Sequence, residues 1–128
     1  MDPEEQARQF RAAFGVENHP EKRSLQFSLI EEEYAEFCEA YHRYNETGEG
    51  AADCLKEAGD VVYVFFQFCA NEGWQLLQAL LRIHVSNMSK LGADGRPVRR
   101  ADGKVLKSIR YKPPYLNDLV KSVEPASN

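Results

Sequence analysis

Apolar side chains recur at every third or fourth position between about residues 22 and 46, and this spacing constrains the fold more than any other feature of the chain. The repeat consists of Phe27, Ile30, Tyr34, Phe37, Tyr41 and Tyr44. Because an α-helix turns once in about 3.6 residues, the repeat predicts one long amphipathic helix with a single apolar stripe. Similar patterns, with their start and stop signals, predict helices over residues 3–14, 51–71 and 74–91.

The pattern changes after Gly92. Asp102 and Gly103 lie between two short segments of strand-compatible residues, which is typical of a tight β-hairpin turn. The sequence therefore predicts an all-α fold, an antiparallel four-helix bundle over about residues 3–91, followed by a short basic β-hairpin arm over about residues 92–116. A chain of 128 residues has the size of one domain, so we expect a single domain over residues 1–128.

Charge is distributed unevenly along the chain. Residues 1–91 carry 8 Lys/Arg against 16 Asp/Glu, whereas residues 92–116 carry 7 against 2. An acidic body argues against a nucleic-acid-binding role. No run approaches the roughly 18 apolar residues of a membrane span, and residues 1–15 are unlike a signal peptide. The 3 cysteines lack CxxC spacing and indicate reduced thiols. We therefore expect a cytoplasmic protein that binds neither nucleic acid nor membrane.

Two groups of carboxylates lie where the predicted helices border the core. With Ile30 at zero on a helical wheel, Glu32, Glu36 and Glu33 lie at roughly 200°, 240° and 300°, beside the apolar stripe. On the next helix, Glu57 and Asp60 lie one turn apart. Carboxylates that face each other across two packed helices repel one another unless a cation neutralises them. Oxygen ligands of this kind select Mg²⁺, with Mn²⁺ as a substitute, over zinc or copper.

Two other interpretations of these carboxylates are a solvated helix surface and a di-iron centre. Any one of the glutamates is well explained as a solvated surface acid. A di-iron centre needs Glu-x-x-His motifs on two helices, and Glu39 and His42, which have this spacing, lie away from the other acids. The agreement of residue type and angle on two helices favours a metal site, and the predicted ligands are Glu32, Glu33, Glu36, Glu57 and Asp60.

The segments that carry these acids resemble a known family. Glu32, Glu33 and Glu36, followed by Glu57 and Asp60, are similar to the EExxE and ExxD signature of the all-α, MazG-like nucleoside triphosphate pyrophosphohydrolases. A later segment resembles the N-x-S-K … RRADGK-x-LK segment of bacterial MazG-like enzymes that act on deoxyuridine triphosphate. It contains Asn87, Ser89, Lys90, Arg99, Arg100, Asp102, Gly103, Lys104 and Lys107. The resemblance covers about residues 10–116.

The resemblance implies a homodimer or homotetramer that hydrolyses a (d)NTP, with dUTP among the candidates, to the monophosphate and pyrophosphate. The five acids would hold Mg²⁺, and a metal-activated water would attack the α-phosphorus. We expect Glu33 to be the general base, because desolvation near the apolar stripe raises the pKa of a carboxyl group. The expected substrate-binding residues are Asn87, Lys90, Arg99, Arg100, Lys104 and Lys107.

Two alternative functions fit the same acidic residues. The phosphoribosyl-ATP pyrophosphohydrolases of histidine biosynthesis share the acidic pattern, and a non-catalytic helical module stabilised by a cation would also explain it. Phe14 or Phe27 could stack on a base, but core packing explains both equally well. The strongly apolar segments 61–70 and 76–85 exceed what one chain can cover, and this favours self-association.

Overall fold

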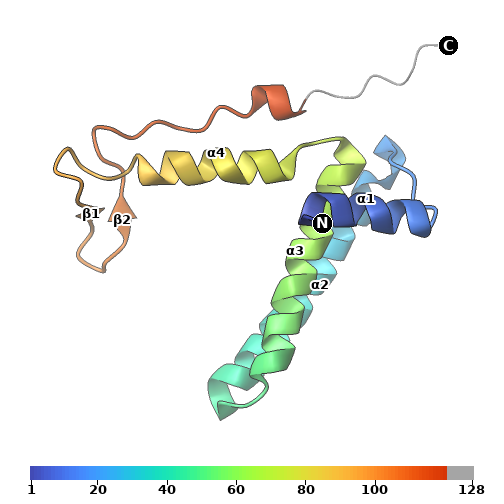
Figure 1. The fold of residues 1–128 in the computed structure, drawn as a ribbon. Helices are drawn as coiled ribbons and strands as arrows, with labels where there is room; N and C mark the ends of the chain where they lie inside the picture. The colour runs from blue at the N-terminus through green and yellow to red at the C-terminus, as the bar shows by residue number, and fades with distance from the viewer. Residues whose placement is uncertain (121–128) are drawn as a thin grey trace. The chain divides into compact units, whose positions relative to one another are not determined.

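The computed structural model describes residues 1–120, which form four α-helices and a two-stranded sheet (Figure 1). The helices are α1 (Pro3–Ala13), α2 (Arg23–Thr47), α3 (Ala51–Glu72) and α4 (Leu76–Met88), and the strands are β1 (Val98–Arg99) and β2 (Val105–Leu106). Short 3-10 helices cover Pro20–Lys22 and Asn117–Val120. The predicted helical character and the hairpin are confirmed, and a closed four-helix bundle stays a prediction. No helix in this part of the chain combines the length and the hydrophobicity needed to cross a bilayer.

The chain divides into two compact units, residues 1–75 and a second unit that begins at Leu76. The sequence predicts a helical core over about residues 3–91 with the arm following it. In the structure α4 lies in the same compact unit as the arm, and polar contacts join α4 to the segment that follows the hairpin. Ser86 Oγ donates to the Lys112 carbonyl at 2.7 Å, and Arg82 Nη2 donates to Asp118 Oδ2 at 3.0 Å.

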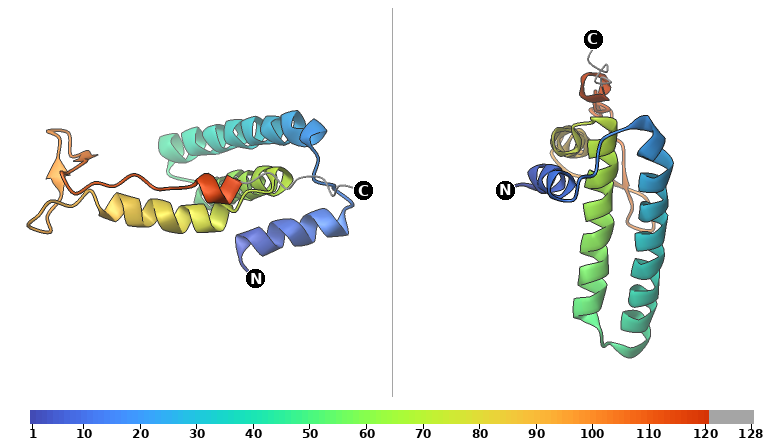
Figure 2. Two further views of the ribbon diagram at one scale, coloured as in Figure 1. Left: turned by 90° about the horizontal axis from the view of Figure 1, so that it is seen from above. Right: turned by 90° about the vertical axis from the view of Figure 1, so that its right-hand side faces the viewer.

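In the first unit, α2 and α3 form an antiparallel helical hairpin, which Figure 1 and Figure 2 show as two long helices side by side. The turn between them is tight because Gly48 and Gly50 adopt φ angles of 73° and 84°, which only glycine reaches without strain. Arg23 pairs with Glu72 near the open end, where Nη2 and Oε2 lie 2.9 Å apart. Arg43 and Asp53 lie 4.0 Å apart near the turn. These two ion pairs mark the register of the hairpin.

The predicted apolar stripe of α2 faces the core only in part. Ile30 and Phe37 are half-buried against α3, but Tyr34 is 58% exposed. The side of α2 that packs on α3 is centred instead on Gln26 and Ala40, which are buried. Among the described residues, the buried apolar side chains are Ala7, Ala40, Phe66 and Leu119. The apolar residues of the long helices are therefore more exposed than the sequence pattern predicts.

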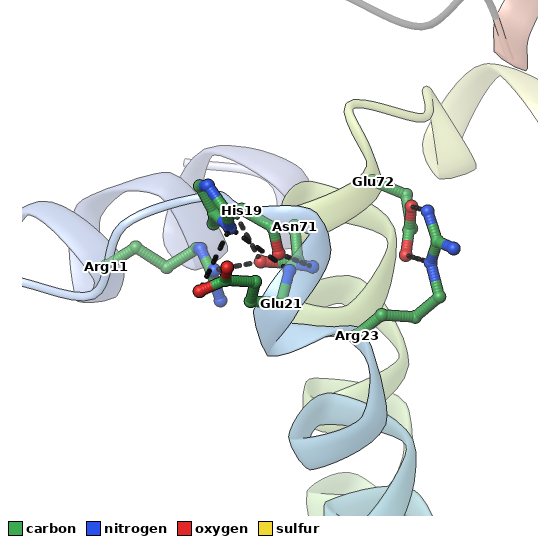
Figure 3. Close-up of polar contacts among 6 residues, drawn as sticks. All are labelled: Arg11, His19, Glu21, Arg23, Asn71 and Glu72. Atoms are coloured by element: carbon green, nitrogen blue, oxygen red, sulfur yellow. Dashed lines mark hydrogen bonds and ion pairs between the residues drawn. The ribbon is translucent and has the colours of Figure 1, made fainter.

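A buried arginine fastens α1 and the following loop to α3, as Figure 3 shows. The Arg11 side chain is only 4% exposed. Its guanidinium donates to Asn18 Oδ1 at 2.6 Å, to Gln67 Oε1 at 3.1 Å and to Asn71 Oδ1 at 3.2 Å. Asn71 in turn donates to the His19 carbonyl at 3.1 Å. Burial lowers the pKa of Arg11, and neutral oxygens on two segments, the loop after α1 and helix α3, satisfy its donors.

In the second unit, the predicted turn at Asp102 and Gly103 closes the β1–β2 hairpin. Val98 pairs with Leu106 and Arg99 pairs with Val105. Gly103 has a φ angle of 91°, and the Arg100 amide donates to the Lys104 carbonyl at 2.8 Å. The arm is thus a short hairpin with exposed side chains on both strands.

Replacing Arg11 with lysine tests how much the hydrogen bonds of the buried Arg11 guanidinium stabilise the fold. Lysine keeps the charge but cannot reach several acceptors in one plane, so buried oxygens lose their partners. We expect the free energy of unfolding to fall by about 2–4 kcal/mol, measured by urea denaturation followed by circular dichroism. Arg8→Lys on the same helix is the control, because Arg8 has a 61% exposed side chain, and we expect a change within about 0.5 kcal/mol. An equal decrease in the free energy of unfolding of the two variants would contradict a stabilising role for the Arg11 hydrogen bonds.

Candidate metal-binding site on the α2–α3 hairpin

Three carboxylates converge where α2 and α3 face each other. One oxygen from each of Glu33, Glu36 and Glu57 lies within 4.8 Å of the other two. Glu33 and Glu36 are one turn apart on α2, and Glu57 lies on α3. The antiparallel register of the two helices places Glu57 close to the two α2 glutamates. Glu33 and Glu57 are half-buried, whereas Glu36 is exposed. We call these three residues the acidic cluster.

Two of the five predicted ligands lie outside the acidic cluster. Asp60 is near enough for its charge to act on Glu33, but its carboxylate pairs with Lys56, with Nζ and Oδ2 2.7 Å apart. Glu32 is exposed on α2 and does not join the group. The helical wheel explains the difference, because Glu32 lies about 100° from Glu33 and hence away from α3.

Lys56 is a residue of this site that the sequence reasoning missed. Its ammonium group also lies 3.6 Å from Glu57 Oε1. The hydrogen bond with Asp60, followed by the charges of Asp60 and Glu57, raises the pKa of Lys56. The spacing of four residues between Lys56 and Asp60 was a visible signal, since such pairs meet on one helix face. Lys56 neutralises the α3 acids in part, and among residues 1–120 no salt bridge provides a cation for Glu33 or Glu36.

The electrostatics of the cluster centre on Glu33. Desolvation raises the pKa of its carboxyl group, and the nearby charge and hydrogen bond of Glu36 and the charges of Asp60 and Glu57 raise it further. Within residues 1–120, Glu33 Oε2 and Glu57 Oε2 are buried and have no hydrogen-bond partner. An unsatisfied buried carboxylate oxygen is costly, so these two atoms call for a proton or a cation.

The donor set fits a hard divalent cation. It consists of carboxylate oxygens alone, it carries excess negative charge, and two of its oxygens lack partners. Soft metals would need Cys or His, and no such residue belongs to the cluster of Glu33, Glu36 and Glu57. These observations favour Mg²⁺ or Mn²⁺, held chiefly by the acidic cluster with Asp60 beside it.

The residues expected to bind substrate all belong to the second unit. Asn87 is exposed on α4, and Lys90 lies in the turn after it, because α4 ends at Met88 and not at Leu91 as expected. Arg100 is held by Asp102, with Nε and Oδ1 2.9 Å apart, and this ion pair raises the pKa of Arg100 and lowers that of Asp102. The Arg100 guanidinium therefore shapes the hairpin turn.

The remaining arm cations differ in how they are engaged. Arg99 Nη1 donates to the Gly103 carbonyl at 3.1 Å. The Lys107 ammonium lies 4.8 Å from the centre of the Tyr111 ring, a cation–π contact. Lys104 is exposed and lies directly before β2. Ser89, which the family segment also includes, accepts from the Lys112 amide at 2.9 Å and thus supports the loop.

A scan against models of known protein families finds no match for this chain, and a search of curated proteins likewise finds none.

Replacing Glu33 with glutamine tests the charge repulsion in the cluster. Because the folded protein raises the pKa of Glu33, its protonated form is favoured, and stability falls as the pH rises through that pKa. In EDTA at about pH 8 we expect Glu33→Gln to melt about 2–5 °C above wild type, with the gap closing near pH 4. Differential scanning calorimetry measures both values.

Mg²⁺ should raise the melting temperature of wild type more than that of Glu33→Gln. A cation that binds only the folded state raises the melting temperature, and Glu33→Gln removes a ligand, so wild type should gain more from Mg²⁺. Glu31→Gln is the matched control, because Glu31 is exposed on the same helix and lies outside the cluster. A Glu33→Gln protein that melts no higher than Glu31→Gln in EDTA would refute the repulsion.

Proposed function

We propose that this protein is a Mg²⁺-dependent nucleoside triphosphate pyrophosphohydrolase that releases the monophosphate and pyrophosphate. The single observation that carries the proposal is the convergence of Glu33, Glu36 and Glu57 within 4.8 Å, with two buried carboxylate oxygens left without partners. A cation site of this composition, in a chain that also carries a set of exposed basic residues, suits a polyanionic substrate. The sequence resemblance to MazG-like enzymes supports the same activity.

The metal would be held by Glu36, Glu57 and Glu33, with Asp60 as a fourth carboxylate once Lys56 turns away. When bound, Mg²⁺ neutralises phosphate oxygens and activates a water molecule for attack on phosphorus. The Lys56 side chain is 66% exposed, so water can solvate its ammonium group when a stronger cation displaces it. Its pairing with Asp60 keeps the α3 acids partly neutral until the stronger cation arrives.

Glu33 is the proposed general base. A base must accept a proton during the reaction, and a raised pKa brings a carboxylate closer to this task at neutral pH. Its unpartnered Oε2 is the atom that would take the proton. Glu36 is exposed at the mouth of the cluster and suits a ligand role better.

Basic groups of the second unit are proposed to bind the triphosphate. Lys90 and Lys104 are the strongest candidates, because no ion pair in the described chain engages their ammonium groups. Arg100 is already paired with Asp102, and its contribution is to hold the turn that presents Lys104. Asn87, Arg99 and Lys107 complete the proposed set.

A substrate panel tests this function. The purified protein is incubated with Mg²⁺ and each of the common dNTPs and NTPs, dUTP and phosphoribosyl-ATP, and pyrophosphate and orthophosphate are quantified separately. We expect pyrophosphate and a nucleoside monophosphate from a subset that includes dUTP, and no product in EDTA. Glu33→Gln should lower kcat at least about 100-fold with a smaller change in KM, whereas Glu31→Gln should match wild type.

Each other outcome of the panel has a defined meaning. Product from phosphoribosyl-ATP alone would replace the proposed substrate class with that of the histidine-pathway enzymes. Orthophosphate as the first product would show that a different bond is cut. No turnover, together with a melting temperature that rises in Mg²⁺, would identify a non-catalytic cation-stabilised module.

A further inference from the structure

A cavity of about 480 Å³ lies beside the acidic cluster on the α2–α3 hairpin. Glu36 and Glu57, two members of the acidic cluster, form part of its wall. Every residue of the wall belongs to the first unit, and the remaining ones are Glu39, Ala40, Arg43 and Asp53. Arg43 is the basic member of this set, so the cavity places a guanidinium group next to the candidate cation site.

Arg43 lies on the side of the hairpin toward which the acidic cluster opens. With Glu33 at zero on a helical wheel for α2, Glu36 lies at about 300° and Arg43 at about 280°. With Glu57 at zero on α3, Asp53 lies at about 320°. Glu33 and Glu57 meet between the two helices, which run antiparallel (Figure 1), so equal rotation from the line of contact leads to the same side. This shared side agrees with the cavity wall, which contains Glu36, Arg43 and Asp53.

The contact that Arg43 makes with α3 is loose. Arg43 Nη1 lies 4.0 Å from Asp53 Oδ2, which exceeds hydrogen-bonding distance. Arg23, near the other end of α2, instead donates to Glu72 Oε2 at 2.9 Å. The side chains of Arg43 and Asp53 are 62% and 75% exposed, and an ion pair of this kind contributes little stability. The contact with Asp53 leaves the guanidinium donors of Arg43 available to an anion in the cavity.

The order of residues along α2 fits an in-line displacement at phosphorus. Glu33 lies about one turn before Glu36, and Arg43 lies about two turns after it. In such a displacement the attacking oxygen and the leaving oxygen lie on opposite sides of the phosphorus atom. With Glu33 as the proposed base, the attacking water lies at the Glu33 end of the cluster, and the leaving group extends toward Arg43.

We propose that Arg43 binds the pyrophosphate part of the triphosphate in this cavity, an inference that rests on the proposed function. The water oxygen bonds to the α-phosphorus and gives its proton to Glu33. The bond from the α-phosphorus to the bridging oxygen breaks, and its electron pair stays on pyrophosphate. A planar guanidinium donates two parallel hydrogen bonds to such a group and stabilises the charge that develops on it.

Mg²⁺ and Arg43 have separate tasks in this arrangement. The cavity wall carries four carboxylates and one guanidinium group, so Arg43 alone cannot attract a polyanion there. A bound cation offsets the carboxylates, and Arg43 adds a directional contact that a spherical ion does not supply. Binding of an anion in the cavity should therefore require both Mg²⁺ and Arg43.

Binding of inorganic pyrophosphate tests the inference without turnover. The full chain is titrated with pyrophosphate by isothermal titration calorimetry, with saturating Mg²⁺ and again in EDTA. We expect wild type to bind only with Mg²⁺, and Arg43→Gln to raise the dissociation constant at least about tenfold. Arg43→Lys keeps the charge and should restore part of this loss. Arg23→Gln is the matched control and should bind as wild type does, because Arg23 is 60% exposed on the same helix and also pairs with an α3 acid.

Asp53→Asn distinguishes anion binding from a structural ion pair. The substitution removes a charge that attracts Arg43 and repels phosphate, so the dissociation constant of pyrophosphate should fall below that of wild type. A purely structural pair predicts the opposite, an equal loss of binding in Arg43→Gln and Asp53→Asn. Circular dichroism and the melting temperature check that each variant folds. With a nucleotide that is hydrolysed, Arg43→Gln should lower kcat by a larger factor than it raises KM, because the charge on pyrophosphate develops in the transition state.

The outcomes separate this inference from the proposed function. It would be overturned if wild type with Mg²⁺ did not bind pyrophosphate, if Arg43→Gln bound as tightly as Arg23→Gln, or if Asp53→Asn lost as much affinity as Arg43→Gln. Pyrophosphate binding that depends on Arg43, without turnover of any nucleotide, would support the anion site and refute the pyrophosphohydrolase.

Discussion

The antiparallel packing of α2 against α3 is the constraint on which the site depends. A turn with two glycines at positive φ and ion pairs at both ends set one register, and that register brings Glu33 and Glu36 level with Glu57. Repulsion among these groups opposes the packing that assembles them, and Lys56 offsets only part of it. The excess negative charge at Glu33, Glu36 and Glu57 would therefore be stabilised by a bound cation. This is the physical basis of the proposed Mg²⁺ chemistry.

Polar contacts to Arg11 and Asn71 join α1 and the following loop to α3 in the first unit. Arg11 is buried among amide and carbonyl oxygens, and Asn71 links it to the loop at His19. Such contacts position α1, and each contributes little net stability because it replaces a hydrogen bond to water, although removing one partner is costly because it leaves buried oxygens unsatisfied. Few large apolar side chains are buried among residues 1–120, so the hydrophobic contribution from within this part of the chain is small.

The sequence by itself determined the helices, the hairpin turn at Asp102 and Gly103, and the candidate acids, because periodicity and turn chemistry are local properties. It placed Glu33, Glu36 and Glu57 correctly on helix sides that could meet. Tertiary structure alone decided that Glu32 stays outside, that Lys56 pairs with Asp60, and that Gln26 and Ala40, not Tyr34, face α3. Those outcomes depend on how far each helix is rotated about its own axis when the two helices pack. The apolar stripe in the sequence does not define this rotation to within a few tens of degrees, because the stripe can pack against a neighbour on either side.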